Sequence, residues 1–329
     1  MKYLLVDTAN TFFRARHAAH RQSDTWTRLG FVMHVTLAGL NKVWRDQKGE
    51  HIVFCLEGRS WRKDFYDPYK KNRAVARASL TEAEQEEDKC FWEAFDEFKN
   101  FVTEKTNCTV LQHNRLEADD LIAGWIQSHP DDEHIIVSSD TDFYQLLSDN
   151  VKQYNGISDE LHTLDGIIDK KGKRVIDKKT KEPKVIPDPE WILFEKCMRG
   201  DATDNVFSAY PGVRKKGSKN KVGLLEAYAD RNSKGYNWNN IMLQRWVDHN
   251  DVEHRVLDDY ERNVILVDLS AQPNDVKEII ATTIAENSVT KEVSQIGTKF
   301  LKFCGKYELT RLSENAQQFA EILSSEYKE

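Results

Sequence analysis

The stretch that decides the fold is His134-Ile-Ile-Val-Ser-Ser-Asp-Thr-Asp142. Its apolar run predicts a short buried strand, and Asp140 and Asp142 lie just beyond the end of that strand. Two earlier stretches have the same form, Tyr3-Leu-Leu-Val-Asp7 and Ile52-Val-Phe-Cys-Leu-Glu57. Each of these predicted strands therefore runs directly into a carboxylate.

Segments with helical spacing of apolar residues separate these strands. They cover about residues 27–46, residues 91–105 and a stretch that opens at Leu116-Glu-Ala-Asp-Asp120, with a further short strand near residues 108–111. Strands that alternate with helices predict an α/β fold with a mainly parallel sheet. The carboxyl ends of such strands share one edge, where ligands bind, so we expect the strand-end acids to lie together there.

The composition excludes several classes of protein. The 329 residues suit one large or two modest globular domains, and the formal net charge of −7 does not suggest a simple basic nucleic-acid-binding protein. No apolar run approaches the roughly 18 residues of a membrane span, and none indicates a signal peptide. The five scattered cysteines form no CxxC pair, which favours reduced thiols and a cytoplasmic location over zinc or disulfides.

The character of the chain changes after about residue 151. Residues 167–184 are polar and rich in lysine, and we expect an exposed hairpin or loop there. Helical sequence follows from Pro189 onward. We therefore predict two parts, an α/β core in residues 1–185 and a mainly helical part in residues 186–329.

Acidic residues form a candidate metal site. Glu117 and Asp120 are three residues apart on one predicted helix face, and Asp201 and Asp204 have the same spacing. The full set of candidate ligands is Asp7, Glu57, Glu117, Asp119, Asp120, Asp140, Asp142, Asp201 and Asp204. Carboxylates 4 Å apart repel by about 4 kcal/mol at an effective dielectric of 20, so gathering them requires divalent cations. Oxygen ligands without His or Cys indicate Mg²⁺, which Mn²⁺ can replace, although each acid taken singly also suits a helix cap or turn.

Basic residues gather in three windows. Residues 59–77 interleave cations with aromatic rings, which suits the phosphates and bases of a nucleic-acid strand, although a solvated helix face is the alternative. Residues 212–221 combine glycines with cations and contain no acid, so backbone amides and lysines can together bind phosphate. Residues 170–184 suit a solvated loop. The candidate nucleic-acid-binding residues are Arg59, Arg62, Lys63, Lys71, Arg77, Gly212, Arg214, Lys215, Lys216, Gly217, Lys219 and Lys221.

A set of motifs follows a fixed order along the chain. They are Leu4-Leu-Val-Asp7 with Phe13-Arg-Ala-Arg16, Tyr69-Lys-Lys-Asn-Arg73, Glu117-Ala-Asp-Asp120, Ser139-Asp-Thr-Asp142 and Gly200-Asp-Ala-Thr-Asp-Asn205. In these motifs, from Met1 to about Tyr228, the chain resembles the structure-specific 5′ nucleases, the family of flap endonucleases and 5′→3′ exonucleases. It looks most like the bacteriophage branch, which includes a ribonuclease H that removes primers.

The resemblance implies a PIN-like 5′-nuclease core, with a central, mainly parallel sheet flanked by helices. It also implies a helical arch in about residues 59–90 and a helix–hairpin–helix-type duplex-binding element in about residues 200–228. By resemblance the nine acids would hold two or three Mg²⁺ ions that activate water and stabilise the leaving oxygen. Lys70 and Arg73 would steer the scissile phosphate from the base of the arch, with help from Arg14. A K⁺ ion often accompanies the hairpin element of the family.

The implied activity is Mg²⁺-dependent 5′→3′ exonuclease and flap endonuclease cleavage near duplex–single-strand junctions during DNA replication or repair. The implied substrates are DNA with 5′ flaps or ends, and RNA/DNA hybrids if RNA primers are removed. We expect a monomer in the cytoplasm, or in the host cytoplasm for a protein of phage origin. A single-strand-binding protein or a sliding clamp is a candidate partner, although no motif indicates one.

The chain departs from the family pattern at two places. Glu57 stands where the family usually has Asp, and residues 212–218 form an expanded version of a hairpin that is usually a compact Gly-x-x-Gly unit. Two other functions remain open, a non-catalytic relative that binds branched DNA and a PIN-type endoribonuclease. An unrelated α/β protein is the least specific alternative.

Overall fold

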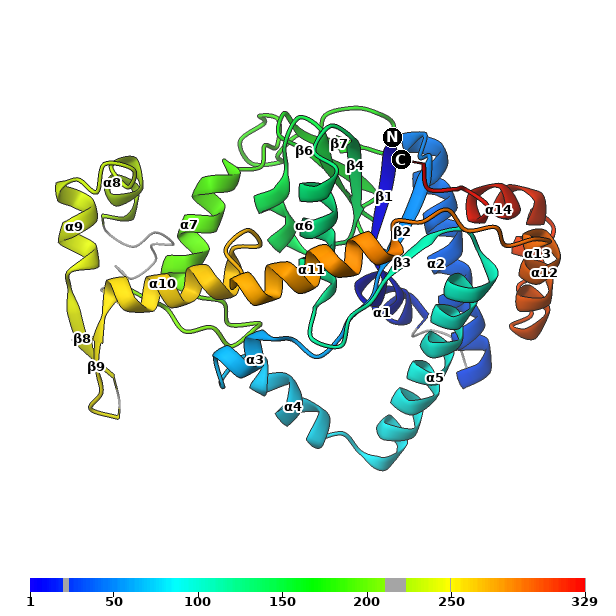
Figure 1. The fold of residues 1–329 in the computed structure, drawn as a ribbon, viewed down its shortest axis with the longest axis horizontal. Helices are drawn as coiled ribbons and strands as arrows, with labels where there is room; N and C mark the ends of the chain where they lie inside the picture. The colour runs from blue at the N-terminus through cyan, green and yellow to red at the C-terminus, as the bar shows by residue number, and fades with distance from the viewer. Residues whose placement is uncertain (20–23, 211–222, 249, 329) are drawn as a thin grey trace. The chain divides into compact units, whose positions relative to one another are not determined.

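The computed structural model describes residues 1–19, 24–210, 223–248 and 250–328 (Figure 1). These residues form two compact units. Unit 1 comprises residues 1–60, 80–186 and 277–329, and unit 2 comprises residues 61–79 and 187–276. Among the described residues, no helix has both the length and the apolar character needed to cross a membrane.

The strands of unit 1 form one sheet in the order β3-β2-β1-β4-β5-β6-β7. They are β1 (Lys2–Asp7), β2 (His51–Cys55), β3 (Thr109–Leu111), β4 (Glu133–Val137), β5 (Val151–Asn155), β6 (Glu160–Thr163) and β7 (Gly166–Asp169). The first five strands in this order are parallel, and β6 runs antiparallel to both of its neighbours. The predicted mainly parallel sheet is therefore confirmed. Its central strands are buried almost throughout, which explains their continuous apolar runs.

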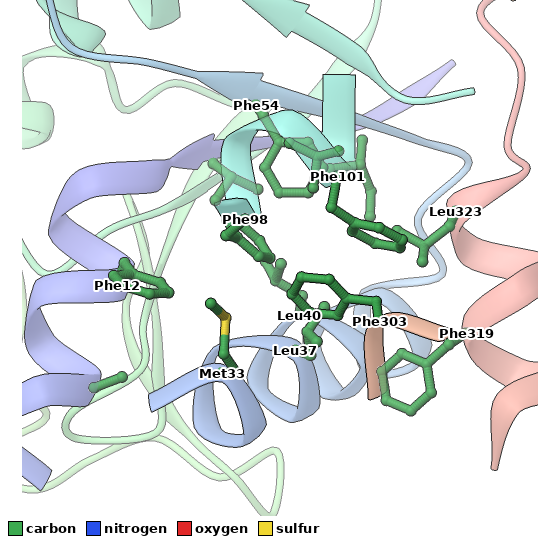
Figure 2. Close-up of a cluster of buried hydrophobic side chains, with 14 of the residues drawn as sticks. Phe12, Met33, Leu37, Leu40, Phe54, Phe98, Phe101, Phe303, Phe319 and Leu323 are labelled. Atoms are coloured by element: carbon green, nitrogen blue, oxygen red, sulfur yellow. The ribbon is translucent and has the colours of Figure 1, made fainter. Parts of the chain in front are cut away.

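Helices of unit 1 cover this sheet. They are α1 (Thr8–Ala18), α2 (Thr25–Gln47), α5 (Glu82–Lys105), α6 (Ala118–Ser128), α11 (Asn274–Asn287, in this unit from Lys277), α12 (Ile296–Lys306), α13 (Thr310–Ser313) and α14 (Ala316–Leu323), with a 3₁₀ turn η2 (Thr141–Leu146). Phe98 and Phe101 of α5 lie in the aromatic centre of the core, close to Phe54 of β2 (Figure 2). The helix expected over residues 91–105 begins earlier, at Glu82, because Thr81 and Glu84 form a capping box.

Unit 2 is mainly helical. It contains α3 (Arg62–Phe65), α4 (Lys71–Ala78), α7 (Pro189–Arg199), α8 (Leu224–Ala229), α9 (Tyr236–Met242), α10 (Val256–Val267) and a hairpin of β8 (Arg245–Val247) and β9 (Glu253–Arg255). One apolar cluster joins α7, α8, α9 and α10 around Phe194 and Trp238. A second cluster packs Tyr69 against Cys197, Val206 and Leu266.

The division into units differs from the expected parts at two segments. Residues 277–329 belong to unit 1, because the apolar stripe of α12 packs against α5 and Phe303 stacks on Phe101 with ring centroids 4.4 Å apart. Residues 61–79 group with unit 2, where Tyr69 is buried in the second cluster. One segment of unit 1 ends at residue 186, and unit 2 resumes at residue 187. The lysine-rich segment forms hairpins after β7, with bridges from Ile168 to Arg174 and from Ile176 to Pro183.

A close backbone contact joins the end of β2 to the segment that precedes α6. The amide of Gly58 donates to the carbonyl of Leu116 at 2.8 Å, and the amide of Arg59 donates to the carbonyl of Asn114 at 2.7 Å. A Cβ atom on Gly58 would lie 2.1 Å from the carbonyl oxygen of His113 and 2.8 Å from that of Leu116. Both obstacles are backbone atoms, so the two segments approach this closely only because residue 58 has no side chain.

Replacing Gly58 with Ala should therefore destabilise unit 1. We expect the free energy of unfolding to fall by about 1–3 kcal/mol, because the two segments must move apart. The matched control is Gly39→Ala in α2, where a new Cβ would meet nothing within 4 Å and where alanine favours the helix by about 0.5–1 kcal/mol. Urea unfolding of the two variants measures both effects. Equal stability of Gly58→Ala and the wild type would contradict the contact.

His51 is a buried histidine that the fold holds in its neutral form. Its Nδ1–H donates to the carbonyl of Ser325 at 3.0 Å, while Nε2 accepts from the hydroxyl of Thr109 at 2.8 Å and from its amide at 3.3 Å. A proton on Nε2 would break the bond from the Thr109 amide. Burial lowers the pKa of His51 to about 4, and the nearby Lys291 acts in the same direction.

This lowered pKa predicts a loss of stability in acid. The unfolded chain binds a proton on His51 near pH 6.5, whereas the folded chain does so only near pH 4, so unfolding takes up a proton between these values. Across this window, His51 should cost the folded state about 3 kcal/mol. Urea unfolding at several pH values should give a smaller loss for His51→Gln than for the wild type. If both lose the same free energy between pH 6.5 and 4, the account of His51 is wrong.

Candidate active site

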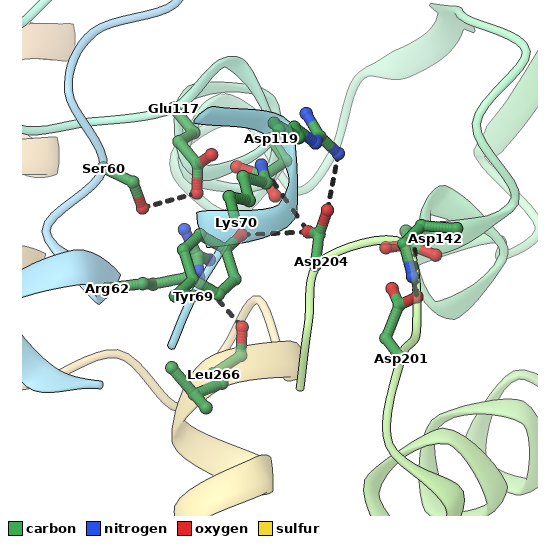
Figure 3. Close-up of polar contacts among 12 residues, drawn as sticks. Ser60, Arg62, Tyr69, Lys70, Glu117, Asp119, Asp142, Asp201, Asp204 and Leu266 are labelled. Carbon is green, nitrogen blue, oxygen red and sulfur yellow. Dashed lines mark hydrogen bonds and ion pairs between the residues drawn. The ribbon is translucent and has the colours of Figure 1, made fainter. Parts of the chain in front are cut away.

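Three acids lie at the N-terminus of α6. Glu117 is the N-cap residue, and Asp119 and Asp120 occupy the first turn. One carboxylate oxygen from each of the three can be chosen so that all lie within 4.8 Å of one another, although Asp120 is fully buried and Glu117 is only 4% exposed. The hydroxyl of Ser60 donates to Glu117 at 2.6 Å (Figure 3). The amide of Glu117 donates to Asp120 at 3.1 Å. The positive end of the helix dipole favours these anions.

Glu57 joins this group from the end of β2. Its carboxylate accepts a hydrogen bond from the amide of Ala118 at 3.4 Å, in the first turn of α6. The close contact at Gly58 brings the two segments together, and the longer side chain of glutamate spans the remaining distance. The acid that departs from the family pattern therefore still reaches the group at α6.

Asp7 and Asp140 form a neighbouring group at the ends of β1 and β4. These strands are paired so that Val6 lies opposite Val137, which brings their carboxyl ends level. Ser138 links the two acids, because its hydroxyl donates to Asp7 at 2.9 Å and accepts from the amide of Asp140 at 3.1 Å. Asp140 in turn accepts from the amide of Asp142 at 3.0 Å.

Electrostatics connects the two groups of unit 1. Cys55, the last residue of β2, has a thiol pKa well above the ordinary value, first because it is buried and then because Asp7 and Glu57 both act on it. Asp7 and Glu57 therefore both lie near Cys55, and the convergence of all the strand-end acids stays a prediction. Carboxylate oxygens gathered in this way are suitable ligands for a hard divalent cation.

Unit 2 holds Asp201 and Asp204 in a tight loop. Gly200 has a φ of +72°, and a Cβ there would lie 2.3 Å from the carbonyl oxygen of Val206, so the loop requires glycine at its start. Lys196 forms an ion pair with Asp201 at 2.9 Å. Burial raises the pKa of Asp201, but Lys196 and hydrogen bonds from Thr203 outweigh it and leave the pKa below its usual value.

Asp204 contacts the two cations expected at the base of the arch. Its carboxylate accepts from the hydroxyl of Tyr69 at 3.0 Å and pairs with Arg73 Nη2 at 2.5 Å and with Lys70 Nζ at 3.5 Å (Figure 3). Lys70 and Arg73 therefore lie with one of the predicted metal ligands. Within unit 2, Asp201 and Asp204 are thus each paired with at least one cation.

One predicted nucleic-acid contact is wrong. Arg62 is only 1% exposed, its Nε donates to the carbonyl of Leu266 at 2.8 Å, and its guanidinium lies 4.8 Å from the centre of the Trp61 ring. Burial likewise removes Trp61 and Tyr69 from the rings available for base stacking, whereas Phe65 is 46% exposed.

The other predicted cations are placed as follows. Arg59, Lys63, Lys71 and Arg77 are exposed, as is Arg14 on α1. The residues expected at the hairpin element, and with them the K⁺ site, lie outside the described residues: Gly212, Arg214, Lys215, Lys216, Gly217, Lys219 and Lys221.

Four polar residues of the site were not identified from the sequence. Ser60 and Ser138 each donate to a candidate ligand, and Asn10 accepts from the amide and hydroxyl of Ser139. Gln153 of β5 donates to the carbonyls of Ser138 and Asp140. Ser138 and Asn10 lie within or beside quoted motifs, which was the available signal. Nothing in the local sequence marks Gln153, because its role depends on the pairing of β4 with β5.

Comparisons with known proteins bear on the family and the fold of this chain. Relatives include DNA polymerase I of Rhizobium leguminosarum, 29% identical over 69% of this chain, and ribonuclease H of Enterobacteria phage T4, 26% identical over 82% of this chain. The match spans 20% of the polymerase and 79% of the phage enzyme. Among solved structures, a bacteriophage T5 flap endonuclease in a complex with DNA and metal ions has a TM-score of 0.56 at 18% identity. That likeness covers 87% of this chain and 98% of that one and shows a common fold.

A family model decides the assignment. The model of the N-terminal resolvase-like domain of 5′-3′ exonucleases matches residues 2–179, more than half of the chain. This segment contains β1 to β7, α6 and all the acids of unit 1 described above. The resemblance inferred from the motifs is thereby confirmed, and the chain belongs to the 5′-3′ exonuclease family.

Proposed function

We propose that this chain is a Mg²⁺-dependent, structure-specific 5′ nuclease. It would act as a 5′→3′ exonuclease and flap endonuclease on phosphodiester bonds near duplex–single-strand junctions, during DNA replication or repair. The observation that carries the proposal is the group formed by Glu57, Glu117, Asp119 and Asp120 at the N-terminus of α6. Family membership and the DNA-bound flap endonuclease of similar fold support the same activity.

The donor set supports Mg²⁺ as the metal. The ligand atoms offered by Glu117, Asp119 and Asp120 are carboxylate oxygens, which suit Mg²⁺ and Mn²⁺ better than zinc. Glu57, Asp7, Asp140 and Asp142 add further oxygens at the same edge of the sheet. When bound, the ions would supply an activated water and stabilise the leaving oxygen of the phosphodiester.

Other residues of the chain would hold the metal ligands in place and bind the scissile phosphate. Ser60 and the α6 amides hold the carboxylates in place, and Ser138 orients Asp7 and Asp140. Lys70 and Arg73 would bind the scissile phosphate and offset its growing negative charge, with Arg14 as a further cation. Asp201 and Asp204 would be further ligands for divalent cations.

The proposal extends to the oligomeric state, location, substrates and partners of the enzyme. We infer a monomer that works in the cytoplasm on DNA with 5′ flaps or ends, and on RNA primers if its activity follows that of the phage ribonuclease H relative. All five cysteines are free, which suits a reducing compartment. A single-strand-binding protein or a sliding clamp is a candidate partner.

Cleavage of a 5′-labelled flap duplex tests the proposal. We expect cutting near the junction that requires Mg²⁺, stops in EDTA and falls by more than about 100-fold in Asp120→Asn, because a buried ligand is lost. The matched control is Asp131→Asn, which removes an exposed acid in the loop before β4, away from the carboxyl edge. Product lengths separate exonuclease from endonuclease action.

Three results would contradict the proposal. Tight flap binding without cleavage in either Mg²⁺ or Mn²⁺ would indicate a non-catalytic relative that binds branched DNA. Cleavage of single-stranded RNA in preference to the flap would indicate an endoribonuclease. Unchanged activity of Asp120→Asn would move the metal site away from α6.

A further inference from the structure

Asp204 has its carboxylate fully engaged by residues of the arch base. Oδ2 accepts from the Tyr69 hydroxyl at 3.0 Å and lies 3.5 Å from Lys70 Nζ, while Oδ1 pairs with Arg73 Nη2 at 2.5 Å. Both oxygens of one anion thus face two cations and one hydroxyl. A carboxylate arranged in this way is already neutralised before any metal ion arrives.

The backbone makes this arrangement well defined. The amide of Lys70 donates to the Asp204 carbonyl at 2.8 Å, and Asn205 Nδ2 donates to the Pro68 carbonyl at 2.7 Å. Lys70 and Asn205 have φ values of +55° and +58°, in the left-handed region that residues other than glycine rarely adopt. Such a conformation persists only where the surroundings enforce it, and it is commoner at functional sites.

Tyr69 is held in place by its packing in the apolar cluster of unit 2. It is 4% exposed and packs with Cys197, Val206 and Leu266. Lys70 Nζ lies 5.0 Å from the centre of the Tyr69 ring, which adds a cation–π contact. Arg73, by contrast, has a side chain that is 52% exposed, so it can leave Asp204 without unpacking anything.

We propose that Asp204 is a shared anion for which Arg73 and Lys70 compete with a divalent cation. A divalent ion on either oxygen would repel the neighbouring guanidinium and ammonium groups, because like charges would then meet at contact distance. Binding of the ion at Asp204 would therefore release both side chains. Tyr69, which carries no charge, would keep Asp204 in position through the exchange.

The consequence is an order of events at the site. Without the ion, Lys70 and Arg73 are paired with Asp204, so little positive charge of the arch base is available to bind a phosphate. With the ion, the same region gains two positive charges and two freed side chains. This inference rests on the proposed function, because it makes Lys70 and Arg73 available to the scissile phosphate only after metal binding.

Calorimetric titration of Mg²⁺ into the DNA-free protein tests the competition. We expect Arg73→Gln to tighten the binding step that depends on Asp204 by about two- to fivefold, the range of a partly exposed ion pair. The control Lys71→Gln removes a neighbouring charge that pairs with Asp67 and should change affinity by less than twofold. Arg73→Lys, which retains the charge, should stay close to the wild type.

A double-mutant cycle separates direct competition from a general loss of positive charge. In an Asp204→Asn background, Arg73→Gln should no longer tighten Mg²⁺ binding, because the shared anion is absent. If Arg73 weakens Mg²⁺ binding, Mg²⁺ must equally weaken the pair between Arg73 and Asp204. Nitrogen NMR of the guanidinium should therefore show that Mg²⁺ releases the Arg73 side chain in the wild type but has no such effect in Asp204→Asn.

The outcomes are decisive in either direction. Weaker Mg²⁺ binding in Arg73→Gln would overturn the inference, because the arginine would then be positioning Asp204 for the metal. Equal tightening in both backgrounds would overturn it as well. Flap cleavage by the wild type is measured separately, so a metal-dependent nuclease that fails these tests refutes the competition and leaves the proposed function standing.

Discussion

Glu117 and Asp120 place two buried carboxylates at the N-terminus of α6, where a third from Asp119 lies within 4.8 Å. At that separation each pair repels by about 3–4 kcal/mol at an effective dielectric of 20. Hydrogen bonds from Ser60 and the α6 amides offset part of this cost, and the helix dipole offsets more. The rest of unit 1 maintains the arrangement, because parallel β1, β2 and β4 deliver Asp7, Glu57 and Asp140 to the same edge. A fold that gathers acids in this way is suited to binding divalent cations.

In unit 2, cations offset the negative charge of the acids. Its two acids are each paired with cations from their own unit, Asp201 with Lys196 and Asp204 with Lys70 and Arg73. In unit 1, Ser60, Ser138 and the amide of Glu117 donate hydrogen bonds to the acids. We therefore expect the cation pairs of unit 2 to weaken the affinity of Asp201 and Asp204 for metal.

Local patterns in the sequence predicted most of the fold, and the same patterns are the basis for predicting an acidic edge. Apolar runs that end at Asp7, Glu57 and Asp140 are legible because buried parallel strands are apolar on both faces. The start of α5 was missed because residues 82–88 are acidic and lack apolar spacing, although the Thr81–Glu84 capping box marks it.

Contacts between distant residues could not be predicted in this way. Arg62 is buried, and its guanidinium donates to the carbonyl of Leu266, which lies 204 positions further along the chain. The residues next to Arg62 in the sequence indicate only a basic surface. The docking of residues 277–329 on the core likewise depends on α5.

The free energy of unfolding, measured as a function of Mg²⁺ concentration, tests the central claim most directly. The wild type should gain about 2.7 kcal/mol at a hundredfold excess over the dissociation constant. Glu117→Gln should be more stable without metal and respond far less to it. A wild type whose unfolding is unaffected by Mg²⁺ and Mn²⁺, or a variant that responds equally, would contradict the account.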